Sequence, residues 1–155
     1  MIQFLLAAPN SGSGKTTLAC ALLAALKNRG YAPCAFKCGP DYIDPMFHRA
    51  VLGVESHNLD LFFSSPETVH GLYASGAAGH GAAVCEGAMG FYDGLSGTST
   101  TASAWQVADT LNLPVLLVVR PKGASLTLAA QIKGLQSFRT PSHLAGILLN
   151  DCKPG

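Results

Sequence analysis

One short segment constrains this chain more than any other, a glycine-rich stretch between an apolar run and a helical one. Residues 8–17 read Ala-Pro-Asn-Ser-Gly-Ser-Gly-Lys-Thr-Thr; residues 2–7 before them are mostly apolar, and residues 16–27 after them are rich in leucine and alanine. A strand, a glycine-rich turn and a helix N-terminus form a phosphate cradle, because backbone N–H groups turn inward and the helix dipole favours an anion. We therefore expect a nucleoside triphosphate site here; the alternative is a plain connector between strand and helix.

The residues of this loop have separate expected roles. Lys15 would reach the β- and γ-phosphates and the Thr16 hydroxyl would hold Mg²⁺. The remaining nucleotide contacts are expected from Asn10, Ser11, Gly12, Ser13, Gly14 and Thr17. Pro9 stands where the strict pattern has glycine, and proline offers no N–H. Asn10 stands where one branch of P-loop proteins carries a second, signature lysine, so the branch is left open.

The length, composition and net charge of the chain exclude several classes of protein. A chain of 155 residues fits one domain, and 48% apolar with only 12% charged residues argues against disorder. The net charge of +1 leaves no basic footprint for nucleic acid or an acidic membrane. No apolar run approaches the roughly 18–20 residues of a membrane span, and no signal segment is apparent. We expect a cytoplasmic protein without nucleic-acid or membrane partners.

The cysteines do not form a recognisable framework. There are five of them, and no C-x-x-C pair occurs. Cys34 and Cys38 are close enough in sequence to suggest metal ligands, but they lack a matching second pair. We expect reduced, mostly buried thiols.

Strand-like and helix-like segments alternate along the chain. Strands are predicted at 2–7, 32–38, 82–86, 114–119 and 145–149, and helices at 16–27, 46–52, 65–75, 102–111 and 126–138. This order predicts an α/β fold with a doubly wound, mainly parallel sheet and right-handed crossovers. Ligands bind such sheets beyond the carboxyl ends of the strands. The loops that begin at Ala8, Lys37 and Glu86 all leave strands there, so we expect them to converge on one site.

Glu86 is the clearest acidic candidate. It ends a buried strand, as the second magnesium-binding acid of a P-loop enzyme does, and its carboxylate would hold Mg²⁺ directly or through water opposite Thr16. The alternative is a carboxylate that caps a local turn.

The loops after the second and third predicted strands add further candidates. Lys37 would hold a transferred phosphoryl group or a substrate carboxylate, or it pairs structurally with Asp41. Asp41 and Asp44 would serve a metal or polar substrate groups, or they cap the short helix that follows. Asp93 lies in a glycine-rich loop that a ligand can approach closely, although it also suits a simple turn. His48 is the one candidate among five histidines, and we expect a surface side chain there.

Several of these segments together resemble a known family. Residues 8–16, 37–45 with His48, 58–60 and 86–94 are similar to the synthetase half of cobyrinic acid a,c-diamide synthase, one of the dethiobiotin-synthetase-like P-loop ligases. The resemblance runs from the first strand to Asn150. It accounts for both Pro9 and the absent signature lysine, and it implies a P-loop NTPase-type fold.

The resemblance implies a reaction. The family amidates the a and c side-chain carboxylates of a corrinoid in cobalamin biosynthesis: ATP phosphorylates a carboxylate, and ammonia displaces phosphate. By position, Asp41, Tyr42, Asp44 and Asp93 would line the corrinoid site, and Asn150 would lie near the adenine. The catalytic candidates are then Lys15, Lys37 and Glu86, and the candidate Mg²⁺ ligands are Thr16, Glu86 and Asp41.

The chain departs from the family pattern in three places. Residues 103–105 read Ser-Ala-Trp where the family usually has Ser-Thr-Ala, and Arg120 stands where aspartate is frequent. The family also carries a glutamine amidotransferase domain, which is absent from these 155 residues. We expect a truncated ATP-binding amide-ligase domain spanning 1–155, with ammonia supplied by a glutamine amidotransferase domain or subunit. A homodimer is left open.

Three rival functions are weighed against this one. The same chemistry could act on another tetrapyrrole such as a nickel sirohydrochlorin, or a related enzyme could carboxylate a small diamine. A Min/Par-type ATPase switch belongs to a different class. That class needs the lysine that is absent at Asn10.

Overall fold

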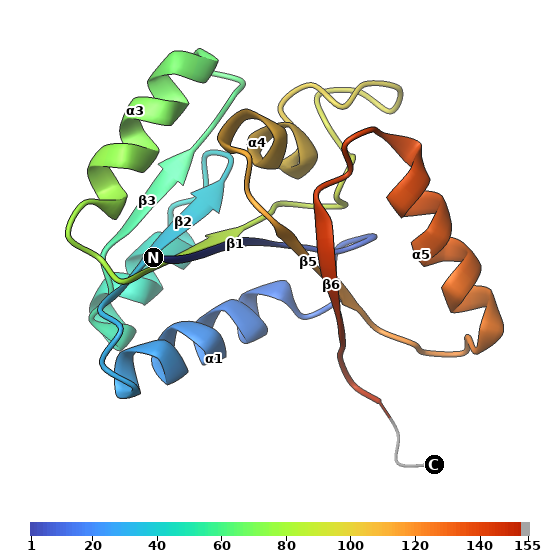
Figure 1. The fold of residues 1–155 in the computed structure, drawn as a ribbon, viewed down its shortest axis with the longest axis horizontal. Helices are drawn as coiled ribbons and strands as arrows, with labels where there is room; N and C mark the ends of the chain where they lie inside the picture. The colour runs from blue at the N-terminus through green and yellow to red at the C-terminus, as the bar shows by residue number, and fades with distance from the viewer. Residues whose placement is uncertain (153–155) are drawn as a thin grey trace.

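The structure is a computed structural model that describes residues 1–152, built on one parallel sheet (Figure 1). Within those residues the six strands lie in the order β3-β2-β4-β1-β5-β6, and every neighbouring pair is parallel. Their bounds are β1 (Ile2–Ala7), β2 (Pro33–Cys38), β3 (Ser56–Leu59), β4 (Ala82–Glu86), β5 (Val115–Val119) and β6 (Leu144–Leu149). The predicted α/β class and parallel sheet are confirmed.

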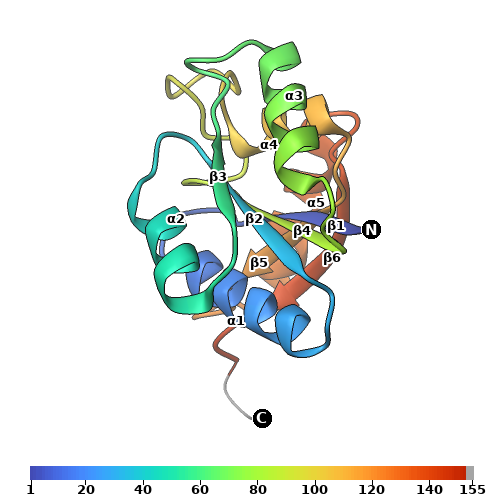
Figure 2. The ribbon, with the colours of Figure 1, turned by 90° about the vertical axis from the view of Figure 1, so that its left-hand side faces the viewer.

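Helices cover both faces of the sheet. They are α1 (Lys15–Asn28), α2 (Ile43–Phe47), the π-helical turn η1 (His48–Leu52), α3 (Pro66–Ala77), α4 (Ala104–Leu111) and α5 (Leu126–Phe138). Helix α1 lies on one side of the sheet, and α3 and α4 lie on the other (Figures 1 and 2). The doubly wound arrangement predicted from the alternating segments is therefore present.

Local capping sets several helix ends. The Ser65 hydroxyl accepts a hydrogen bond from the Thr68 amide at 3.3 Å, with Pro66 in the first helical position of α3. Ser103 caps α4 in the same way, by accepting from the Gln106 amide at 3.2 Å. Both helices start within two residues of the positions expected from sequence.

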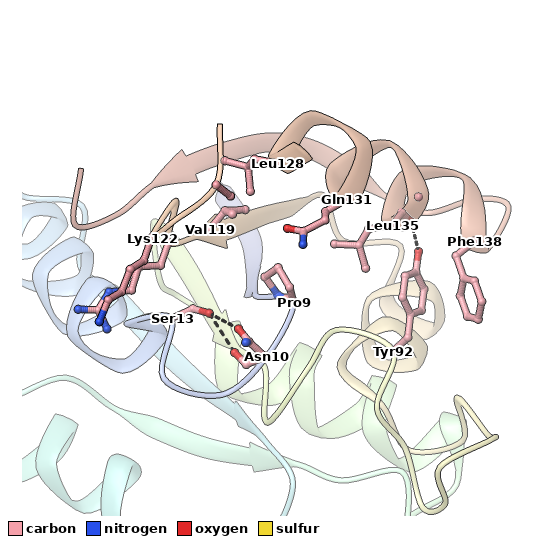
Figure 3. Close-up of a pocket in the computed structure, with 13 residues that line it drawn as sticks. Pro9, Asn10, Ser13, Tyr92, Val119, Lys122, Leu128, Gln131, Leu135 and Phe138 are labelled. Carbon is pink, nitrogen blue, oxygen red and sulfur yellow. Dashed lines mark hydrogen bonds between the residues drawn. The ribbon is translucent and has the colours of Figure 1, made fainter. Parts of the chain in front are cut away.

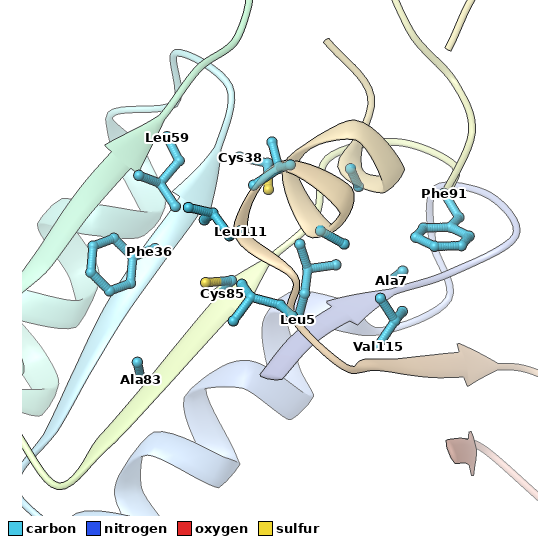
Figure 4. Close-up of a cluster of buried hydrophobic side chains, with 14 of the residues drawn as sticks. Leu5, Ala7, Phe36, Cys38, Leu59, Ala83, Cys85, Phe91, Leu111 and Val115 are labelled. Carbon is cyan, nitrogen blue, oxygen red and sulfur yellow. The ribbon is translucent and has the colours of Figure 1, made fainter. Parts of the chain in front are cut away.

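A separate apolar core lies on each face of the sheet. Under α3 and α4, Leu5, Phe36 and Cys85 project from three strands toward Leu111 (Figure 4). On the opposite face, the buried residues Leu6, Val84 and Val118 of the sheet belong to one cluster with Ala19 and Leu23 of α1. Strands covered on both sides need nearly continuous apolar sequence, and this explains the unbroken runs in the central strands.

Two charged residues interrupt the burial pattern of the central strands. All residues of β2 and β4 are buried, including Lys37 and Glu86, which are 6% and 1% exposed. Each lies at or next to the carboxyl end of its strand. Charged side chains are almost never fully buried unless they are paired, so these positions mark a specialised site.

Two sequence-based expectations were wrong or incomplete. Strand β3 was not predicted, because Ser-His-Asn-Leu has neither an apolar run nor a β-branched residue; β2 supplies its hydrogen-bond partners. His48 was expected on the surface, but it is only 1% exposed, because the η1 turn packs it against β3.

Most of the cysteine side chains among the described residues are buried, as expected. All five thiols are free; Cys34, Cys38 and Cys85 are buried, and Cys152 is exposed. Burial raises the pKa of Cys34 to about 11 and that of Cys38 to about 12. Among residues 1–152 no three His, Cys, Asp or Glu side chains cluster as a metal site.

None of the helices within residues 1–152 combines the length and apolar character needed to cross a membrane.

Candidate functional site

The glycine-rich loop joins β1 to the first turn of α1, as the sequence predicted. Gly14 has a φ of 94°, and a Cβ at this position would overlap the side chain of Asn150. Ser13 fixes the preceding turn, because its hydroxyl donates to the backbone oxygen and to the side-chain oxygen of Asn10 at 3.0 and 2.9 Å. The Asn150 amide donates to the Ser13 carbonyl at 2.9 Å. Asn150 therefore touches the phosphate loop from the end of β6.

Lys15 links this loop to the segment after β4. Its ammonium donates to the Met89 carbonyl at 2.7 Å and lies 3.5 Å from the Asn10 carbonyl. Burial lowers the pKa of Lys15, and the nearby carboxylate of Glu86 offsets part of that effect. The ammonium thus sits in a partly desolvated position beside the loop, where its attraction for an anion is stronger than in water.

Strand order brings Lys37 and Glu86 together. Strand β4 lies between β1 and β2, and its Glu86 is the direct register partner of Lys37 in β2. Side chains of register partners project from the same face of a sheet. The Lys37 ammonium accordingly donates to Glu86 Oε1 at 2.8 Å.

The Lys37 ammonium is the centre of a buried charge cluster. It also lies 2.6 Å from Asp44 Oδ2 and 3.9 Å from Asp41 Oδ2. Burial by itself would lower the pKa of Lys37, but the charges of Glu86 and Asp44 outweigh burial and raise it. Lys37 therefore stays cationic at the junction of the acidic loop and β4. The sequence analysis offered an ion pair between Lys37 and Asp41 as the alternative role of Lys37. That ion pair is present, but its distance is longer than those from Lys37 to Asp44 and Glu86.

Glu86 also reaches α1. The Thr16 hydroxyl donates to Glu86 Oε1 at 2.6 Å, so this oxygen accepts from both Thr16 and Lys37. The second oxygen, Oε2, is buried and has no hydrogen-bond partner among the described residues. An oxygen that is buried and unpartnered beside a threonine hydroxyl fits a Mg²⁺ site, because Mg²⁺ takes carboxylate, hydroxyl and phosphate oxygens.

Asn58, on the unpredicted strand β3, holds the acidic loop. Its amide donates to the carbonyl oxygens of Gly39 and Asp41, each at 2.7 Å. Asp41 in turn accepts from the amides of Ile43 and Asp44 at 2.9 and 3.3 Å, and this caps the start of α2. Asp41 therefore has the helix-capping role that the sequence analysis gave as one of its two possible roles. The only signal for Asn58 was its place in one of the segments that carried the family resemblance.

These side chains surround one hollow of about 440 Å³ at the carboxyl edge of the sheet. Its lining comprises Ser11, Gly12, Gly14, Lys15, Thr16, Thr17, Lys37, Asp41, Asp44, Glu86, Gly87, Ala88 and Met89. The loops that follow β1, β2 and β4 thus converge, as expected. With Lys15 and Lys37 in the same lining as the Thr16–Glu86 pair, the hollow can hold a polyphosphate together with a divalent cation.

Several candidate residues do not line this hollow: Asn10, Ser13 and Asn150 of the expected nucleotide contacts, and the substrate candidates Tyr42 and Asp93. Tyr42 is 77% exposed and lines a neighbouring shallow depression with Asp41. Asp93 closes a turn by accepting from the Gly90 amide at 2.9 Å, and it lines a separate hollow with Met89 and Tyr92. Asp93 thus stabilises a turn, as the sequence analysis allowed, and it also lines a hollow that is open to solvent.

His48 begins the η1 turn and contacts β3. Its Nδ1 is 3.0 Å from the Ser56 hydroxyl, and its Nε2 is buried without a partner among the described residues. Burial lowers the pKa of His48, and the charges of Glu86 and Asp44 only partly counter this. The imidazole therefore links η1 to β3 through Ser56.

Comparison with known proteins agrees with this geometry. Residues 4–155 match the model of the CbiA family, described as the CobQ/CobB/MinD/ParA nucleotide binding domain. Cobyrinate a,c-diamide synthase of Gloeobacter violaceus is 47% identical over 149 residues, which cover 96% of this chain and 33% of that protein. Hydrogenobyrinate a,c-diamide synthase of Streptomyces coelicolor is 45% identical over 148 residues, 96% of this chain and 30% of that protein.

A third relative extends the match to the whole chain. Cobyrinate a,c-diamide synthase of Clostridium acetobutylicum is 41% identical over 155 residues, which are 100% of this chain and 35% of that protein. The chain thus spans about a third of the length of the curated relatives it matches. These matches confirm the resemblance predicted from the motifs, and the chain belongs to the CobQ/CobB/MinD/ParA nucleotide binding domain family.

Proposed function

We propose that this chain is the ATP-binding synthetase part of an enzyme that amidates the a and c carboxylates of a cobyrinic acid-type corrinoid in cobalamin biosynthesis. The observation that carries the proposal is the buried junction of Lys37, Glu86 and Thr16 beside the phosphate loop. The names of the relatives, cobyrinate and hydrogenobyrinate a,c-diamide synthase, support the choice of substrate. We also propose that the protein acts in the cytoplasm, as composition predicted.

The first step would form an acyl phosphate. A substrate carboxylate oxygen attacks the γ-phosphorus of ATP, and the bond from that phosphorus to the bridging oxygen of ADP breaks. Negative charge shifts to the bridging oxygen, and the three γ-oxygens stay anionic. Lys15 and Lys37 supply cations on two sides of this hollow, fixed in place before the reaction, which is the arrangement that stabilises a transition state.

Thr16 and Glu86 would hold Mg²⁺, with Asp41 as a further ligand through water. The free oxygen Oε2 of Glu86 and the adjacent Thr16 hydroxyl support this assignment. When bound, the ion would neutralise phosphate oxygens and orient the triphosphate. Asn10, Ser11, Gly12, Ser13, Gly14 and Thr17 would contact the phosphates, and Asn150 would lie near the adenine, in keeping with its contact to Ser13.

The second step would consume ammonia. Ammonia attacks the acyl carbon, phosphate leaves, and the nitrogen loses a proton, so the product is an amide. Asp41, Tyr42, Asp44 and Asp93 would line the corrinoid site around the hollow. We propose that a glutamine amidotransferase domain or subunit normally supplies the ammonia, in line with the fraction of the relatives that this chain covers.

The experiment supplies the chain with Mg²⁺, ATP and cobyrinic acid, with either ammonium or glutamine, and follows amide formation by mass spectrometry. We expect product with ammonium, at a rate that climbs with pH toward the ammonia pKa of about 9, and none with glutamine. Glu86→Gln should abolish the product, whereas Glu67→Gln, on the exposed first turn of α3, should not.

The controls separate the parts of this proposal. Product with glutamine and this chain alone would contradict the assignment of ammonia supply to another domain or subunit. Full activity of Glu86→Gln would contradict the metal assignment. If Mg·ATP binds but cobyrinic acid is neither bound nor amidated, the proposed substrate is wrong.

A further inference from the structure

A larger hollow, of about 650 Å³, lies on the other side of the phosphate loop (Figure 3). We call it the α5 pocket. Pro9, Asn10 and Ser13 of the phosphate loop form one wall, and Leu128 and Leu135 of α5 form the opposite wall. The reaction described above uses Asn10 and Ser13 of this lining as phosphate contacts, and none of the lining residues from Val119 to Phe138.

One end of the α5 pocket is aromatic. The Tyr92 and Phe138 rings lie 4.9 Å apart, between centroids, and Tyr92 is held by its hydroxyl, which donates to the Leu135 carbonyl at 2.7 Å. Phe138 is 56% exposed, although an aromatic ring of this size gains free energy when it is covered. The two rings are tilted by 57° to each other, and the Arg139 guanidinium lies 4.6 Å from the centroid of the Phe138 ring. This end therefore offers aromatic surface with a cation beside it.

The other end is cationic. Arg120 and Lys122 line the pocket where the chain leaves β5, and Lys122 lies opposite Phe138 across the length of the hollow (Figure 3). Arg120 pairs with Asp151 through its Nε at 2.6 Å. No carboxylate among the described residues lies within ion-pair distance of Lys122, so this end keeps an uncompensated positive charge.

The α5 pocket is contiguous with the site through shared walls. Tyr92 and Phe138 also line the hollow that contains Asp93, and Met89 lines both that hollow and the phosphate hollow. A large ligand can therefore extend from the phosphate hollow around the loop after β4 to the α5 pocket, whereas a small one would occupy a single hollow.

We propose that the α5 pocket binds the part of the polycarboxylate macrocycle that is not being amidated, with Lys122 and Arg120 holding its distant carboxylates. The proposal rests on the proposed function. A corrinoid is a broad apolar ring with carboxylates on its rim, and the pocket offers an apolar and aromatic wall that ends in cations. A nucleoside is a poorer match, because its base carries no charge to pair with Lys122.

The single tryptophan provides the binding signal. The Trp105 ring lies 6.2 Å from that of Tyr92, between centroids, and its indole donates to the Pro141 carbonyl at 3.1 Å. A corrinoid absorbs light and should quench this fluorescence when it binds. Titration of the chain with cobyrinic acid, at two salt concentrations, gives a dissociation constant without need for turnover.

Three variants test the assignment. Lys122→Glu should weaken cobyrinic acid about tenfold and reduce the salt dependence of binding, since charge pairs at exposed positions are screened by salt. Lys133→Glu, an equal charge change on an exposed position of α5 outside the pocket, should stay within about twofold of the wild type. Phe138→Ser should weaken both cobyrinic acid and its uncharged methyl ester, whereas Lys122→Glu should spare the ester.

The outcomes are distinct. If Lys122→Glu and Lys133→Glu bind cobyrinic acid equally, this inference fails while the proposed function stands. If Lys122→Glu weakens Mg·ATP as much as cobyrinic acid, the pocket serves the nucleotide and the inference is overturned. If the wild type binds Mg·ATP but not cobyrinic acid, the proposed function itself is wrong.

Discussion

The substitution Lys37→Met isolates the energetics of the buried charge cluster. Methionine approximates the length of the lysine stem but has no ammonium. In the wild type the ammonium contacts Glu86 at 2.8 Å and Asp44 at 2.6 Å, and their side chains are 2% and 17% exposed. The variant leaves these carboxylates facing each other without a cation, so we expect a large loss of stability.

The size of the expected loss in unfolding free energy depends on how deeply the two carboxylates are buried. Removing one partner of a buried ion pair costs about 3–5 kcal/mol, because the remaining charge is neither solvated nor paired. Asp44 retains some solvent contact and can rehydrate, so we expect the lower end, about 3 kcal/mol. For a chain of this size each kcal/mol corresponds to about 2–4 °C, so the melting temperature should fall by about 6–12 °C.

The pH dependence has a definite sign. The folded-state pKa of Lys37 is raised, so its stabilisation is fully present below its unfolded pKa of about 10.4 and is lost only at higher pH. The stability gap between wild type and Lys37→Met should therefore persist from pH 5 to pH 9 and narrow only as the pH rises above about 10.

The assay is urea unfolding, followed by circular dichroism and Trp105 fluorescence, in a chelator so that no divalent cation contributes. Lys133→Met, at an exposed position of α5, is the matched control and should stay within about 0.5 kcal/mol of the wild type. The double variant Lys37→Met/Glu86→Gln should recover about 1–3 kcal/mol relative to the sum of the two single losses. If Lys37→Met is as stable as the control, or if the two losses simply add, the cluster does not have the coupling that its geometry implies.

Three further predictions concern single groups. Lys15→Ala should weaken Mg·ATP roughly 30- to 150-fold, a loss of about 2–3 kcal/mol, and equal affinities in calorimetry would reject the phosphate assignment. Because burial lowers the folded-state pKa of His48 below its unfolded value of about 6.5, the unfolded chain binds more protons in mild acid, and stability should fall as pH drops from 7.5 to 5.5. His48→Gln should reduce that fall in urea titrations; an unchanged slope would mean that other groups cause it. A thiol reagent should label the exposed Cys152 quickly and the buried Cys34 and Cys85 only on unfolding, and mass spectrometry that found equal rates would contradict the packing.

Local structure could be predicted from the sequence, because its signals act between neighbouring residues. The apolar runs at 2–7 and 114–119 indicated strands, and the Ser65–Pro66 start indicated a helix; both kinds of element are present. The glycine-rich loop was recognisable for the same reason. Its positive φ at Gly14 and the helix N-terminus that follows are properties of a few consecutive residues.

The failures came from contacts between distant segments. Strand β3 has a polar sequence and exists because β2 supplies its hydrogen-bond partners. His48 carries no sequence mark of burial; its position depends on how the η1 turn packs on β3. Asn58, which fixes the acidic loop through two carbonyl oxygens, was missed as a supporting residue because its strand was missed.

In the candidate site, too, the sequence specified the residue types and the tertiary structure specified their contacts. The sequence by itself determined which residue types are available: a lysine at 37 and a glutamate at 86 near the carboxyl ends of two strands, and a threonine at 16 in the first turn of α1. Only the tertiary structure decided that Glu86 accepts from both others, across separations of 49 and 70 residues. The physical reason is strand order: β4 inserts between β1 and β2, and that choice depends on burying both faces of the whole sheet rather than on any local preference.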